Sequence, residues 1–134
     1  MSRRLAVALT AGLIAVAALF VWQGWPESGP NAVAYAQSPT YAVELRSERP
    51  QVGVTVFELA VRNASGGPVD LDGVMVEAAM PVMGHATPPV TAVRIAAGRY
   101  QARGELFSMP GAWEVTVRLG ATGETATATV AVTR

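Results

Sequence analysis

The chain has 134 residues, with ten arginines, no lysine and ten acidic residues, so its formal net charge at pH 7 is zero. This length allows one domain with a small core, and the lack of a basic patch leaves nucleic-acid binding without an electrostatic basis. The chain has no cysteine, which excludes disulfides, thiolate metal sites and thiol nucleophiles.

The N-terminus has the features of an export signal. Two arginines precede an apolar run from Leu5 to Trp22, and this pattern predicts a signal peptide or a membrane-anchor helix over residues 1–22. Both alternatives place the domain outside the cytoplasm, in the periplasm or cell envelope. Residues 5–22 are the predicted membrane contact.

Two observations bear on whether this leader is removed. Ala34-Tyr35-Ala36 has the small-x-small pattern of a signal peptidase site and favours a mature chain that begins at Gln37. The site lies far from the apolar run, with Trp22 and Trp25 between them, as expected of an interfacial anchor. Cleavage after Ala36 and retention therefore both stay open.

Composition divides the rest of the chain into a linker and one domain. Residues 23–39 are rich in Pro, Gly, Ser, Asn and Ala, which predicts a linker, and the domain is expected over residues 40–134. Within the domain, apolar residues alternate and turn residues interrupt them at short intervals. Extended runs are predicted at 41–45, 52–61, 69–80, 93–95, 99–106, 113–119 and 125–133.

About seven strands without a helix predict an all-β domain, an immunoglobulin-like antiparallel β-sandwich. Trp113 and Tyr100 are expected in its core because aromatic side chains bury the largest area. Met75 is expected in the core as well, from its place in the strand alternation.

One stretch carries most of the candidate chemistry: Met80-Pro81-Val82-Met83-Gly84-His85. It combines two thioethers with the single histidine of the chain, and Gly84 allows a sharp turn that could bring these donors together. Met109, before Pro110-Gly111, is a possible fourth donor. Thioether and imidazole donors suit Cu(I), and neutral thioethers bind it without losing a proton.

The same stretch and four others occur in the order seen in a known family. They are Gly66-Gly67-Pro68-Val69, Val74 to Ala79, Met80 to His85, Ala97-Gly98-Arg99-Tyr100, and Met109-Pro110-Gly111-Ala112-Trp113-Glu114-Val115. The chain thereby resembles the YtkA-like domain family, related to the FixH proteins that assist assembly of a copper-containing terminal oxidase. The resemblance implies an exported bacterial β-sandwich without an established activity. Thr87-Pro88-Pro89 departs from the glycine-rich segment common in relatives.

A structural interpretation of the motif has equal weight. Methionine fills irregular gaps, so Met80 or Met109 could pack beside Trp113 while His85 bonds to the backbone. Two functions then remain: a Cu(I)-binding module that uses Met80, Met83, His85 and Met109 and exchanges copper with a donor or acceptor, or a membrane-anchored module for oxidase assembly.

The sequence predicts a non-enzymatic domain. The sequence has no G-x-S-x-G motif whose serine His85 could activate, and no serine has an evident base beside it. Asp70 and Asp72 are the only closely spaced acids of note, and they are expected on a solvated strand face.

Overall fold

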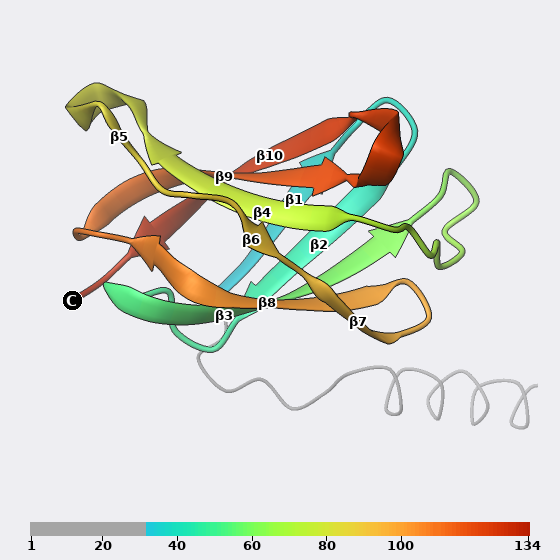
Figure 1. Cartoon of the computed structure of the whole chain (residues 1–134), viewed down its shortest axis with the longest axis horizontal. Coiled ribbons are helices and arrows are strands. Elements are labelled where there is room, and N and C mark those ends of the chain that lie inside the picture. The colour runs from blue at the N-terminus through green and yellow to red at the C-terminus, as the bar shows by residue number, and fades with distance from the viewer. Residues whose placement is uncertain (1–31) are drawn as a thin grey trace, which may run out of the picture.

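Alternating apolar residues form two antiparallel sheets in the computed structural model, which describes residues 32–134 (Figure 1). The expected leader, residues 1–22, and residues 23–31 of the expected linker lie outside the described residues. The described part is all-β, apart from two short 3₁₀ turns. It contains no helix long and apolar enough to cross a membrane.

The first sheet has the order β1-β2-β3-β8-β7. Its strands are β1 (Ala32–Gln37), β2 (Ala42–Ser47), β3 (Gly53–Arg62), β7 (Val93–Ala96) and β8 (Arg99–Phe107). The run predicted at 52–61 is its middle strand, β3.

The second sheet has the order β10-β9-β4-β5, and β6 also pairs with β4. Its strands are β4 (Val74–Met80), β5 (His85–Ala86), β6 (Val90–Thr91), β9 (Gly111–Leu119) and β10 (Thr125–Val132). The 3₁₀ turns are η1 (Pro81–Met83), between β4 and β5, and η2 (Gly120–Thr122), between β9 and β10.

The core lies between the two sheets, as the alternation predicts. Trp113 is fully buried and meets Phe107 edge-on with ring centroids 5.6 Å apart, and Phe107 meets Phe57 in the same way at 6.0 Å. Each such side chain contributes roughly 1.5–3 kcal/mol by leaving water. Tyr100 is also buried, so both aromatic core predictions are confirmed.

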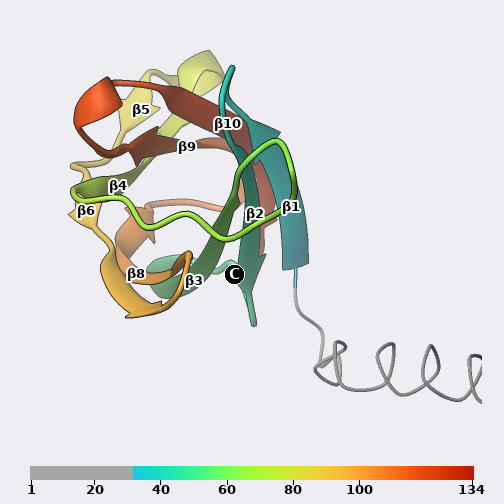
Figure 2. The ribbon, with the colours of Figure 1, turned by 90° about the vertical axis from the view of Figure 1, so that its right-hand side faces the viewer.

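The predicted start of the folded domain at residue 40 is wrong. Residues 32–37, expected in the linker, form β1 and pair with β2 from Ala32↔Ser47 to Gln37↔Ala42. Figure 2 shows β1 beside β10, with which it is in contact, so that β1 covers one side of the two-sheet stack. The described strands are the seven predicted ones together with β1 and the two-residue strands β5 and β6.

Met75 is the second correction. The inward side chains of β4 are Val74, Val76, Ala78 and Met80, and all four are buried. Met75 has the opposite parity and lies half-buried on the outer face, where Arg118 of β9 and Thr91 of β6 are its register partners. Neighbouring strands, and not the core, cover it.

Candidate functional site

Met80 and His85 are brought together by strand pairing. They are direct partners in the antiparallel β4–β5 register, so their side chains project from the same face with Cβ atoms about 4.5–5.5 Å apart. The turn between them is η1, which ends at Gly84 in the left-handed conformation, φ 67°. Gly84 therefore allows the reversal that the motif requires.

Met80 lies between the core and this histidine. The β4–β9 pairing ends at Ala79↔Glu114, and the next residue of each strand beyond this pair, Met80 on β4 and Trp113 on β9, is buried on the inner face. The inner face thus carries, in order across the sheet, Trp113, Met80 and His85. Trp113 is fully buried, Met80 is 7% exposed and His85 is exposed at the sheet edge.

Met109 reaches this region from the connection between β8 and β9. Its backbone oxygen accepts a hydrogen bond of 3.0 Å from the indole nitrogen of Trp113, and its side chain packs half-buried against the core. In Figure 1, this connection and the β4–β5 turn lie at the same end of the molecule. Met109 is thereby tied to Trp113, which is buried on the same inner face as Met80.

Gly111 is a residue whose role the sequence alone did not assign. A Cβ atom at this position would lie 3.0 Å from Cε of Met80, and its φ of 135° is one that L residues rarely adopt. Absence of a side chain at Gly111 leaves room for the Met80 methyl group. The spacing Met109, Gly111, Trp113 therefore has a physical basis in the packing of Met80.

Thr87 is a second supporting residue that sequence reasoning missed. Its hydroxyl lies 3.2 Å from the carbonyl oxygens of Ala78 and Leu106, and its N–H donates to Ala78 O at 2.9 Å. Since Ala78 belongs to β4 and Leu106 to β8, Thr87 links the two sheets just after His85. The segment Thr87-Pro88-Pro89, which differs from the glycine-rich segment of relatives, is therefore anchored to both sheets through Thr87.

Met83 has a different position from the other predicted donors. It is 57% exposed in η1, next to Val82, which is 94% exposed. The arrangement is therefore divided: Met80 is buried, Met109 is half-buried, and Met83 and His85 face solvent.

The region is nearly free of formal charge. His85 is the only ionisable side chain between Glu77 and Arg94, and none lies between Glu105 and Glu114. Over residues 32–134, no three His, Cys, Asp or Glu side chains gather closely enough to hold a metal ion. The donors present here are instead thioethers and one imidazole, which suit soft cations and not Ca²⁺ or Mg²⁺.

The remaining motifs meet at the opposite end and have structural roles. Gly98 packs against Pro68, since a Cβ on Gly98 would lie 2.7 Å from Cβ of Pro68. The Tyr100 hydroxyl donates to Leu71 O at 3.0 Å and accepts from Leu71 N. These contacts fix the loop before β4.

Asp70 and Asp72, expected on a strand face, lie in this same loop. Asp70 accepts hydrogen bonds from Gly98 N at 2.8 Å and from Arg94 Nη1 at 2.9 Å. Its carboxylate therefore joins the loop to the β7–β8 turn. Asp72 is exposed.

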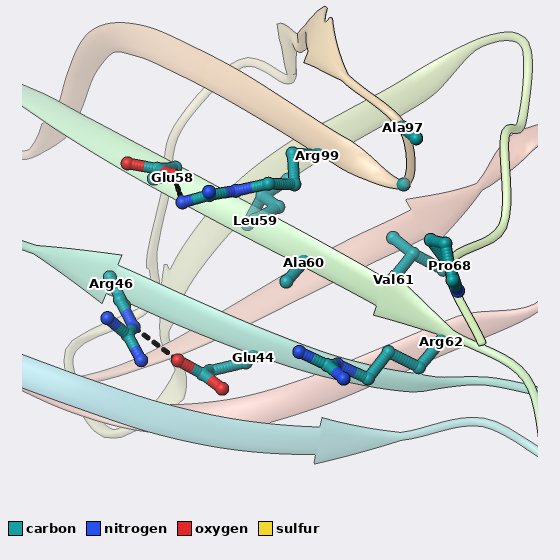
Figure 3. A pocket seen from close by; sticks show the side chains of 11 residues that line it. Glu44, Arg46, Glu58, Leu59, Ala60, Val61, Arg62, Pro68, Ala97 and Arg99 are labelled. Carbon is teal, nitrogen blue, oxygen red and sulfur yellow. Dashed lines mark hydrogen bonds and ion pairs between the residues drawn. The ribbon is translucent and has the colours of Figure 1, made fainter. Parts of the chain in front are cut away.

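A hollow of about 270 Å³ opens elsewhere, on the outer face of the first sheet (Figure 3). Arg46 pairs with Glu44 there, and Arg99 pairs with Glu58. Within each pair the positive and negative charges cancel, and no methionine or histidine lines the hollow. It is separate from the predicted donor set.

Comparison with known proteins identifies the family. No curated protein and no solved structure matches the chain. The family model described as YtkA-like matches residues 35–118. The match begins within β1 and ends within β9, so it covers both groups of motifs. The chain belongs to the YtkA-like family.

Proposed function

We propose that this protein is an exported, non-enzymatic domain that binds Cu(I) as cargo through Met80, Met83, His85 and Met109. The observation that carries the proposal is the register pair of Met80 and His85, with Met109 tied to Trp113 in the same uncharged region.

The donor chemistry supports a monovalent soft ion. Thioethers and a neutral imidazole add no negative charge, so they suit Cu(I), whereas hard divalent ions need several oxygen ligands. His85 and Met83 are accessible from solvent, and Met80, the register partner of His85, is buried. An incoming Cu(I) ion would meet the exposed side chains, His85 and Met83, first. A protein that delivers or removes copper could reach the same side.

A competition titration tests this proposal. The full chain, purified in detergent without oxygen, is titrated with Cu(I) against a colorimetric chelator. We expect one-to-one binding, and a loss of roughly tenfold or more in affinity for Met80→Leu and His85→Ala, because removing a ligand should cost at least as much as disturbing its surroundings. Met83→Leu and Met109→Leu test the other two donors.

Met75→Leu is the matched control. It changes a methionine of the same strand to the same residue, but on the opposite face. Because Met→Leu conserves volume, the substitutions should cost less than about 1.5 kcal/mol in stability. Equal affinities for Met75→Leu and for all four donor variants would refute the copper site.

One observation favours a second function, a membrane-anchored module for assembly of an oxidase. Val82 and its neighbour Met83 in η1 are 94% and 57% exposed, and exposed apolar side chains that lie together are typical of surfaces that contact a partner. Under this alternative, Val82→Asp changes the unfolding free energy by less than about 0.5 kcal/mol but lowers the amount of assembled oxidase in the host membrane. Normal assembly with this variant would contradict it.

A further inference from the structure

The small-x-small sequence that resembles a signal peptidase site lies inside a paired strand. Ala34, Tyr35 and Ala36 are the middle of β1, where their register partners on β2 are Leu45, Glu44 and Val43. Cleavage after Ala36 would leave Gln37 as the only residue of this strand.

β1 is a component of the core and not an appendage. Ala36 is only 4% exposed, and Ala34 lines the same hollow as Leu45, Phe57 and Val130, which belong to β2, β3 and β10. Without β1, the edge of β2 would lose its backbone partners, and water would reach the apolar side chains beneath. Unpaired backbone groups and exposed apolar area both destabilise the fold.

The other sites of this pattern near the end of the linker do not spare β1 either. Cleavage after Ala34 would use Ala32-Val33-Ala34 and divide β1, and cleavage after Ser38 would use Ala36-Gln37-Ser38 and remove the whole strand. Between Gln23 and Asn31, no bond has small residues at both the first and third positions before it. The family match begins at residue 35, so it includes the last three residues of β1.

We infer that the native protein keeps β1 together with residues 5–22, and that this apolar segment anchors the domain in the lipid bilayer. The run from Leu5 to Trp22 is close to the length of about 20 apolar residues that crosses the hydrocarbon. The domain is then a membrane-tethered protein whose partner at the N-terminus is lipid. This inference does not depend on copper binding.

The test is the mature N-terminus of the protein in cells. The full chain with a C-terminal tag is expressed in a bacterium, and its intact mass and its fractionation after an alkaline wash are measured. We expect the mass of the uncut chain and recovery in the membrane fraction. A mature chain that begins anywhere from Val33 to Pro39 would overturn the retention of β1, and a soluble chain that begins between residues 18 and 32 would overturn the anchor.

A matched variant shows that the leader can reach the peptidase. Pro26→Ala combined with Ser28→Ala creates Ala-Glu-Ala before Gly29, upstream of β1. This variant should be cut, lose its membrane attachment and keep β1. Neither substitution changes a proposed copper-binding residue, so the result is independent of the copper titration.

Discussion

Gly111→Ala tests the packing that joins the two motifs of the candidate site. The new Cβ would lie 3.0 Å from Cε of Met80, and the residue would have to keep a φ of 135° at the start of β9. Two costs arise: backbone strain for an L residue in this region, and displacement of the Met80 methyl group. Both act at the inner-face position between Trp113 and His85.

The magnitude follows from these two costs. A backbone held in a sparsely populated region costs about 1–3 kcal/mol. The methyl group is the far end of a flexible side chain, so it moves at the cost of an off-rotamer torsion, about 0.5–1.5 kcal/mol. We therefore expect Gly111→Ala to lower the unfolding free energy by about 2–4 kcal/mol, at roughly 4–8 °C in Tm for each kcal/mol in a domain of this size.

Chemical and thermal unfolding of the full chain measure this loss, with Gly123→Ala as the control. Gly123 also has a positive φ, 72°, but a Cβ there would meet nothing within 4 Å, so it reports backbone strain alone. Met80→Leu removes the terminal methyl group, and in that background Gly111→Ala should cost less. If Gly111→Ala costs the same with Met80 as with Leu at that position, the assigned contact is wrong.

Three further substitutions test the contacts that support the fold, each by equilibrium unfolding. Tyr100→Phe leaves the backbone groups of Leu71 without their hydroxyl partner and should cost about 1–3 kcal/mol, and an unchanged stability would exclude that role. Gly98→Ala should cost more than the glycine control, because its Cβ would lie 2.7 Å from Pro68 Cβ, and an equal cost would show that this loop yields freely. Thr87→Val removes the hydroxyl contacts to β4 and β8 and should cost about 1–3 kcal/mol, whereas a gain in stability would show that they are dispensable.

The strands that lie between two neighbours were predictable from the sequence because burial on one face imposes strict alternation. In β9, Trp113, Val115 and Val117 are buried, whereas Glu114 is exposed. A local period of two residues is sufficient evidence for such a strand. The residues of the core between the sheets could be predicted for the same reason.

β1 was not predictable in this way because its stabilisation is non-local. Its sequence, Ala-Val-Ala-Tyr-Ala-Gln, is dominated by alanine, a weak strand former with little area to bury. It becomes a strand because β2 supplies backbone partners and β10 lies alongside. The prediction that Met75 lies in the core was wrong for a related reason. β4 has apolar residues on both faces, so the alternation does not show which face is inward.

The candidate site was partly predictable. The sequence places Met80 and His85 close along the chain, but only the register shows that they are direct partners on one face. Their pairing depends on η1 and on the left-handed Gly84, which the composition of the motif permits but does not impose. Gly111 and Thr87 could not be assigned because their roles arise from contacts with residues distant in sequence.

The separation of the family motifs into two ends suggests how their roles can be distinguished. Gly98, Tyr100 and Pro68 fix one end through close packing and hydrogen bonds, and no candidate donor lies among them. Met80 and Gly111 also pack closely, but Met80 adjoins His85, an exposed imidazole at a sheet edge. Close packing against Gly111 gives Met80 a structural role, whereas nothing in that packing requires a histidine beside it. His85 is therefore the residue at which a structural role and a copper-binding role predict different consequences: His85→Ala should leave stability nearly unchanged and still weaken Cu(I) binding.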